Sequence, residues 1–232
     1  MRPLYLAGAA LLLFQAFGIF LPMGILGTAI DWPASLDFPP AKVLPLIQAQ
    51  ESAVRLGYGL YLGWSLTFAA SAALIVGLAR GDRPMTALST LAVGLGVASA
   101  LARAIGIVRW LTGSSALADA YAAAPAGSTE RIAIETTQLA LNAYGGSIGE
   151  DLGVSAFAAI WLAFTGAVIL KDKGLPTWLG WTAFPVAAVA AMPATGLVGL
   201  ASPVDVVVAT TAMLLWIAAA AVVLALRGLQ RG

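Results

Sequence analysis

The sequence predicts an all-α fold, a polytopic membrane helical bundle of six transmembrane helices with short extracytoplasmic helical connectors. Sixty per cent of the 232 residues are hydrophobic and ten per cent are charged, whereas about a quarter of the residues of a soluble domain are charged. The apolar residues form long runs separated by polar turns, and a membrane-spanning helix takes roughly 20 apolar residues. A single helical domain over residues 1–232 therefore accounts for the chain.

Six apolar runs define the expected spans. The first run is longer than the core of a signal peptide, about 7–15 residues, so we expect a retained span with a kink at Pro22. The last span should begin at Ser202-Pro203, with Asp205 as a capping carboxylate rather than a functional group. The spans are expected at about 4–30, 52–78, 85–110, 148–170, 176–199 and 203–226.

Two longer connectors are expected: residues 31–50 lie between the first and second spans, and residues 111–130 follow the third span. Pro40 suits the first turn of a helix, which we expect to run from the connector into the second span. Ser128 suits the N-cap of another helix of mixed polarity. Four polar residues of that helix lie at i, i+4, i+7 and i+11 and so form one stripe: Arg131, Glu135, Gln138 and Asn142.

Glycines recur where this helix meets the fourth span. Gly145, Gly149 and Gly153 are spaced every four residues, and small residues at that spacing allow helices to approach closely. The neighbouring pair Gly145-Gly146 is compatible with a bend and with an unbroken helix that carries the stripe on to Glu150. The sequence leaves both possibilities open.

The charges predict how the bundle is oriented. With six spans, one side carries most of the basic residues near span ends, and the positive-inside rule places that side in the cytoplasm. We therefore expect both termini to be cytoplasmic, in the inner (plasma) membrane, with membrane lipids as the surrounding partners. The basic residues on this side are Arg2, Arg80, Arg83, Lys171, Lys173, Arg227 and Arg231.

Composition also excludes several kinds of chemistry. The chain has no Cys and no His, which removes disulfides, thiol nucleophiles and thiolate or imidazole metal sites. We expect no cofactor and no metal. The net charge of +1 gives no reason to expect a nucleic-acid partner.

Polar residues between 103 and 153 form the candidate site, because charges at membrane depth are costly and usually functional. Arg109 lies about 9 Å nearer the outer surface than Arg103. Glu150 begins the next span, and neighbouring spans usually pack together, so we expect Glu150 to meet one of these arginines, with Arg103 as its main partner. The candidate ligand-binding residues are Arg103, Arg109, Glu150, Glu135, Gln138, Asn142 and Tyr144.

A purely structural interpretation of these charges stays open. Arg109 beside Trp110 at a helix end is typical of an interfacial anchor whose charged head reaches the surface. The helix dipole alone favours Glu150 and Asp151 near a helix N-terminus. An Arg103–Glu150 pair would also hold two helices together without binding anything.

Several motifs together resemble a known family. They are Arg103-x5-Arg109-Trp110, then Tyr121, then Leu-Asn-x-Tyr-x-Gly-x-x-Gly-Glu-x-Leu-Gly at 141–153, and Leu-Pro-x-Trp-Leu-Gly-Trp at 175–181. They are similar to bacterial multi-pass membrane proteins grouped as domain of unknown function 4386. The resemblance implies a helical membrane bundle of this size and no particular activity.

Three functions remain compatible with the sequence. The first is an outward-facing polar pocket between the third and fourth spans that binds a small anionic or amphipathic, lipid-like ligand through Arg103 and Arg109, with transport as an extension. No internal repeat marks two transporter halves. The second is an accessory or structural subunit of a larger membrane complex. The third and weakest is a metal-independent intramembrane enzyme that uses Glu150, Asp151 or Tyr144.

Overall fold

The computed structural model describes residues 2–230, and it contains helices and no β-strand in that part of the chain. Arg231, one of the basic residues that predicted the orientation, lies outside the described residues. Within them, six helical stretches are long and apolar enough to cross a membrane, which confirms the predicted fold class. They are Pro3–Ile30, Glu51–Arg80, Ala87–Ala123, Thr129–Asp172, Thr177–Val198 and Val206–Gln230.

The first stretch consists of two helices, α1 (Arg2–Phe17) and α2 (Phe20–Ile30). The break lies at Gly18 and not at Pro22, where a kink was expected. A Cβ atom on Gly18 would lie 2.6 Å from the carbonyl oxygen of Phe14 and 3.0 Å from the Trp64 ring, so only glycine fits. Pro22 is in the first turn of α2, where its missing N–H leaves no helical hydrogen bond unmade.

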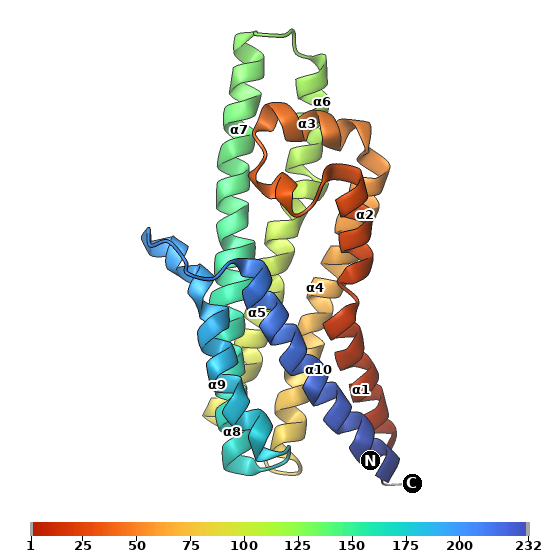
Figure 1. Cartoon of the computed structure of the whole chain (residues 1–232), viewed down its shortest axis with the longest axis vertical. Coiled ribbons are helices and arrows are strands. Elements are labelled where there is room, and N and C mark those ends of the chain that lie inside the picture. The colour runs from red at the N-terminus through yellow and green to blue at the C-terminus, as the bar shows by residue number, and fades with distance from the viewer. Residues whose placement is uncertain (1, 231–232) are drawn as a thin grey trace.

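The first connector forms a short 3₁₀ helix, η1 (Ala34–Asp37), and α3 (Pro40–Ala49). Pro40 begins α3 as predicted. The expected continuation into the second span is wrong, because α3 ends at Ala49 and lies across the top of α4 (Glu51–Arg80) as a separate helix (Figure 1).

The middle of the chain forms two helical stretches of 37 and 44 residues. The first contains α5 (Ala87–Leu111) and α6 (Gly113–Ala123). The second contains α7 (Thr129–Gly146), the π-helical η2 (Ser147–Phe157) and α8 (Ala158–Asp172). At 1.5 Å per residue they reach about 55 and 65 Å, well beyond a hydrocarbon core of about 30 Å.

The surplus length projects at one end. Figure 1 shows α6 and the upper half of α7 as a hairpin that rises past α3. The connector expected over residues 111–130 is therefore mostly a helical extension of the third span. Its N-cap is as predicted, since the Ser128 hydroxyl accepts a hydrogen bond from the Arg131 N–H at 3.2 Å.

The helix does not break at Gly145-Gly146 but continues directly into η2. The predicted close packing of the glycines is confirmed. A Cβ atom on Gly149 would lie 3.0 Å from the Gly106 Cα atom of α5, and one on Gly145 would lie 2.5 Å from the Arg109 Cδ atom. The backbones of α5 and η2 therefore touch, because no side chain separates them.

The last elements are α9 (Thr177–Ala191), the 3₁₀ helix η3 (Met192–Val198) and α10 (Val206–Gln230). The prediction that α10 starts at Ser202-Pro203 is wrong by a few residues. The carboxylate of Asp205 accepts hydrogen bonds from the N–H groups of Val207 at 2.7 Å and Val208 at 2.9 Å. Asp205 is thus the N-cap itself, and its predicted role as a cap is confirmed.

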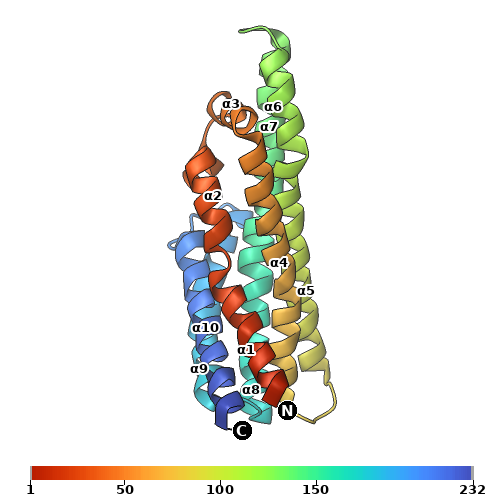
Figure 2. The same cartoon turned by 90° about the vertical axis from the view of Figure 1, so that its right-hand side faces the viewer.

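Two apolar cores stabilise the bundle. The lower core joins α1, α4, α8, α9 and α10 around Trp161, Phe68 and Trp216. The upper core joins α2, α3, α4, α5 and α6 around Tyr58 and Trp110. Figure 2 shows these two levels from the side, with α3 and the hairpin above the ends of α9 and α10.

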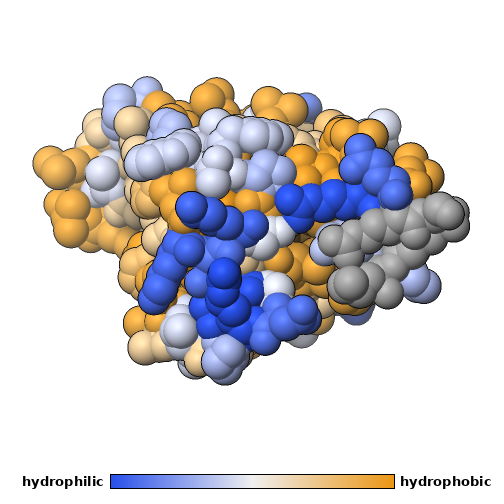
Figure 3. Space-filling view, turned by 90° about the horizontal axis from the view of Figure 1, so that it is seen from below, coloured by the Kyte–Doolittle hydropathy of each residue, from blue (hydrophilic) through white to orange (hydrophobic). Residues whose placement is uncertain are grey.

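Basic side chains gather at the lower end, where α1 begins and α10 ends. Arg80 forms a buried ion pair with Asp172, and Arg83 lies 3.6 Å from the same carboxylate. Lys171 and Lys173 are exposed beside them. Figure 3 looks onto this end and shows hydrophilic residues spread over it.

Candidate functional site

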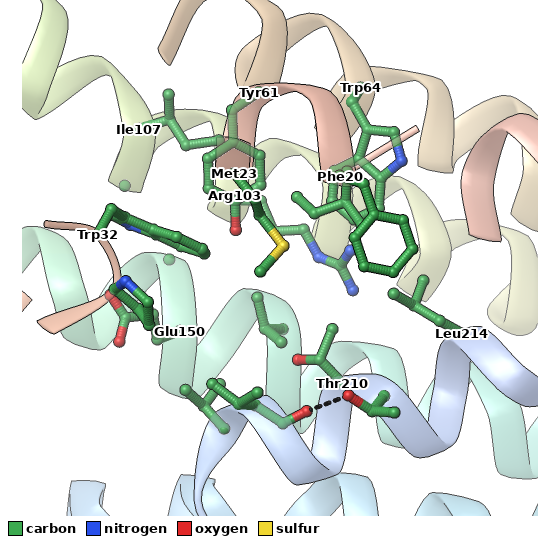
Figure 4. A pocket seen from close by; sticks show the side chains of 18 of the residues that line it. Phe20, Met23, Trp32, Tyr61, Trp64, Arg103, Ile107, Glu150, Thr210 and Leu214 are labelled. Carbon is green, nitrogen blue, oxygen red and sulfur yellow. Dashed lines mark hydrogen bonds between the residues drawn. The ribbon is translucent and has the colours of Figure 1, made fainter. Parts of the chain in front are cut away.

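An apolar cavity of about 220 Å³ lies in the upper half of the bundle. Its walls come from the end of α1, from α2, α4, α5 and η2, and from the first half of α10, and aromatic side chains dominate them. Figure 4 shows Phe20, Met23, Trp32, Tyr61 and Trp64 around it, with Leu214 of α10 opposite. We call this space the apolar cavity.

Exposed lining residues of α2 and α10 mark the place where the cavity reaches the surface, and we call this opening the mouth. Figure 1 shows α10 running beside α1 below and turning away from α2 above. Three of the residues that line the cavity beside this gap are largely exposed, namely Phe20 (62%), Val207 (48%) and Leu215 (64%). All three are apolar, so a hydrocarbon chain can pass this mouth without losing contact with apolar surface.

Arg103 points into the apolar cavity from α5 (Figure 4). The side chain is buried, and its guanidinium carbon lies 4.3 Å from the centre of the Phe68 ring. The Nε and Nη2 atoms have no hydrogen-bond partner. None of the ion pairs among the described residues includes Arg103, so the expected Arg103–Glu150 pair is wrong.

Glu150 pairs with Arg109 instead, and their side chains lie 3.4 Å apart (Nη2 to Oε1). Gly145, near the end of α7, explains this choice, because it leaves the space that the Arg109 side chain fills. Arg109 also donates a hydrogen bond to the Gly106 carbonyl oxygen at 3.1 Å. It is buried, so its interpretation as an interfacial anchor is wrong.

Trp110 is not an interfacial anchor either. It is almost fully buried, and its ring stacks on Tyr58 of α4 with centroids 5.2 Å apart and planes 6° apart. Both rings line the apolar cavity. The Arg109-Trp110 pair therefore belongs to the cavity wall and not to the surface of the bundle.

A second, polar pocket of about 240 Å³ adjoins the apolar cavity. Leu36, Arg109 and Glu150 line both spaces, so the Arg109–Glu150 pair stands between them. We call this space the polar pocket. Its remaining lining residues are Asp37, Asn142, Ala143, Gly146, Ser147 and Asp151.

The polar stripe of α7 faces the other elements of the upper core, and only its last member reaches a pocket. Asn142 donates a hydrogen bond to the Leu36 carbonyl oxygen at 2.8 Å and lines the polar pocket. Glu135 accepts a hydrogen bond from the Tyr121 hydroxyl at 3.1 Å. Gln138 is buried and lines neither space. The hydrogen bond with Tyr121 makes Glu135 part of the link between α6 and α7, which is a structural role.

Tyr144 does not line either space, because its side chain is 71% exposed. Arg131, at the start of the stripe, donates a hydrogen bond to the Tyr121 carbonyl oxygen at 3.2 Å and stacks on the Tyr121 ring. Of the seven candidate residues, the structure thus brings Arg103, Arg109, Glu150 and Asn142 to the two adjoining spaces.

The sequence did not indicate the aromatic and α10 residues of the site. Trp32 and Tyr61 meet edge to face, with ring centroids 6.0 Å apart and planes at 76°. Thr210 and Leu214 enter from α10, more than a hundred residues beyond Arg103. Their contribution depends on which helices pack together, and no local motif reveals that.

Comparisons with known proteins add one finding. A family model described as "Domain of unknown function (DUF4386)" matches residues 6–228. This match agrees with the motifs around Arg103, Glu150 and Pro176. No curated protein and no solved structure matches the chain. Among the described residues, no group of three or more His, Cys, Asp or Glu side chains could hold a metal ion.

Proposed function

Because the chain belongs to the family described as domain of unknown function (DUF4386), and this description names no activity, we propose its function from the two adjoining spaces. The protein is an integral membrane protein that binds a small amphipathic, lipid-like molecule with an anionic group. The anionic group lies against Arg103 in the apolar cavity. The apolar tail extends through the mouth between α2 and α10 towards the membrane.

The observation that carries the proposal is the buried guanidinium of Arg103. Moving a charge from water to the protein interior without a partner costs several kcal/mol, and the contact with the Phe68 ring offsets only part of this cost, about 2 kcal/mol. The Nε and Nη2 donors have no acceptor and adjoin an apolar space. A carboxylate or phosphate provides both the missing charge and the missing acceptors.

The geometry of the mouth supports a membrane-derived ligand. The exposed apolar residues on both sides of the mouth would lie among lipid tails, so a lipid-like molecule would enter sideways without crossing water. By the positive-inside rule, the basic end with Arg80 and Lys171 is cytoplasmic. The apolar cavity and the polar pocket then lie in the outward half of the protein.

The test compares ligands that copurify with variants of the protein. Arg103→Ala and Glu150→Gln are purified in parallel with Arg55→Ala, which removes an exposed arginine paired to Glu51 on the surface of α4. Native mass spectrometry should find a bound anionic amphiphile on the wild type and on Arg55→Ala, and at least a tenfold lower occupancy on Arg103→Ala, since a charge-assisted hydrogen bond contributes about 1.5–3 kcal/mol. Identical occupancy on all four proteins would contradict the proposal.

One feature favours a second candidate, an accessory subunit of a larger complex. The part of α7 that belongs to the hairpin exposes large apolar residues: Ile132 is 60% exposed and Leu139 is 56% exposed. Extraction in a mild detergent distinguishes the candidates. A stoichiometric partner that is lost on Ile132→Lys and Leu139→Lys substitution supports the subunit, and a stable lone protein counts against it.

A further inference from the structure

We propose that the ligand is zwitterionic, and that a second subsite beside Glu150 binds an ammonium group of the same head group whose anionic part lies against Arg103. This inference rests on the proposed function and narrows its ligand to one chemical class. It concerns the wall that the apolar cavity and the polar pocket share.

The residues that line the two spaces carry more negative than positive charges, which does not suit a ligand that is only anionic. Arg103 and Arg109 are the cationic residues that line them, and Asp37, Glu150 and Asp151 are the anionic ones. The ion pairs among the described residues use Glu150 once, with Arg109, and do not include Asp37 or Asp151. A ligand with only negative charge would pair with Arg103 and leave Asp37 and Asp151 without a cation.

Aromatic rings add a second feature that suits a cation. Trp32 and Tyr61 form an edge-to-face corner with centroids 6.0 Å apart, and both line the apolar cavity together with Glu150 (Figure 4). A cation is attracted to the face of a Trp or Tyr ring within about 6 Å of its centre. Carboxylate and aromatic faces therefore occur in the same space as the unpartnered guanidinium.

The two subsites lie at different depths along α5. Arg103 and Arg109 are six residues apart, which is about 9 Å along the helix axis. Glu150 is held at the level of Arg109 by their ion pair. A head group whose negative and positive charges are separated by a short linker can reach from one level towards the other, while its single tail leaves by the mouth.

The experiment uses amphiphiles that share one brominated dodecyl tail and differ in the head group: phosphoethanolamine, phosphate and trimethylammonium. Bromine quenches tryptophan fluorescence, and Trp32, Trp64 and Trp110 line the apolar cavity. Each amphiphile is titrated into the full-length protein in nanodiscs. The wild type should bind the phosphoethanolamine about tenfold more tightly than the phosphate, since hydrogen bonds between charged groups are the strong ones.

Variants of Glu150 separate the subsites. Glu150→Gln should lose the advantage of the phosphoethanolamine and keep the affinity for the phosphate, and Glu150→Asp should keep the advantage. Glu51→Gln, an exposed carboxylate of α4, is the matched control and should behave as the wild type. If Glu150→Gln does not fold, the relative affinities of the wild type and of Glu150→Asp for the head groups test the ammonium subsite.

The outcomes distinguish this inference from the proposed function. Equal wild-type affinity for the two phosphate amphiphiles, or an equal loss of both in Glu150→Gln, overturns the ammonium subsite and leaves the anionic ligand in place. Failure of both phosphate amphiphiles to bind the wild type, or unchanged binding by Arg103→Ala, overturns the proposed function itself.

Discussion

At the scale of single residues, the bundle buries arginines in two different ways. Arg80 and Arg109 each lie beside a carboxylate, of Asp172 and Glu150. Arg103 is as deeply buried, at 4% exposure, but it lies against the Phe68 ring and takes part in none of the ion pairs among the described residues. Leaving a buried charge without a partner costs about 3–5 kcal/mol. An apolar side chain of similar size in place of such a charge should therefore be stabilising. We therefore expect the paired arginines to stabilise the fold and the unpaired Arg103 to destabilise it.

This difference gives the first prediction. Arg103→Met should raise the stability of the detergent-solubilised protein by about 1–4 kcal/mol, because it removes an unpaired charge and keeps most of the side-chain volume. The measurement is the unfolding transition followed by tryptophan fluorescence. The same variant should lose the ligand, so stability and binding should change in opposite directions.

Arg80→Met is the matched control for that measurement. It leaves Asp172 with only the exposed Arg83, 3.6 Å away, so we expect a loss of about 3 kcal/mol. If Arg103→Met is destabilising to the same extent, Arg103 is a structural link between helices, and its position at the cavity is incidental.

At the scale of the elements, the contact between α5 and η2 positions the site. Its glycines bring the two backbones together, and the shared surface holds Arg109 beside Glu150. A π-helical stretch often marks a functional site, and here it runs from Ser147 to Phe157 and includes Glu150. The wider π-helical turns and the missing side chains together set the position of the carboxylate.

Gly106→Ala tests this contact. The added Cβ atom would lie 2.7 Å from the Gly149 Cα atom and 3.0 Å from the Gly145 carbonyl oxygen, so the two backbones must separate. We expect a loss of about 1–3 kcal/mol and weaker ligand binding, both measured on the purified variant. Gly59→Ala in α4 is the control, since nothing lies within 4 Å of its added Cβ atom and alanine favours a helix by up to about 1 kcal/mol. A loss of equal size in both variants would contradict a specific role for the contact.

Some packing features of these helices can be predicted from local sequence, and others cannot. The spacing of Gly145, Gly149 and Gly153 was sufficient to predict close packing, since it depends on one helix face. The same glycines did not reveal whether the helix breaks, because a glycine pair is compatible with both outcomes until the packing on α5 decides. Arg103 and Arg109 are both on α5, and only the three-dimensional position of Gly145 determines which one meets Glu150.

At the scale of the whole molecule, the divergence of α2 from α10 creates the mouth. The chain has no Cys, so a single introduced thiol can be labelled without background. A bulky maleimide on Phe20→Cys, at the mouth, should slow ligand uptake at least tenfold by blocking the gap. The same label on Leu66→Cys, exposed on α4 and not part of the cavity wall, should leave uptake unchanged. Equal uptake by both labelled proteins would show that the ligand enters elsewhere.

Most of the fold was predictable because composition and apolar runs report directly on membrane spans. The site was only partly predictable, for a physical reason. Charged residues such as Arg103 and Glu150 stand out against an apolar background, whereas Trp32, Tyr61 and Thr210 are ordinary residues that become site residues only when distant helices pack. The length of the hairpin was also missed, because the alanine-rich α6 extends α5 across a polar segment that resembles a loop.

The orientation of the bundle is a prediction that concerns the whole molecule. Basic residues surround the end that holds Arg83 and Lys171, and the hairpin with Asp119 forms the other end, so the positive-inside rule places the hairpin outside. Asp82→Cys and Asp119→Cys are both exposed positions in the structure. In intact spheroplasts, a membrane-impermeant maleimide should label Asp119→Cys and not Asp82→Cys, and both should react after lysis. The opposite pattern would turn the mouth and the polar pocket towards the cytoplasm, and the ligand would then have to come from the inner leaflet.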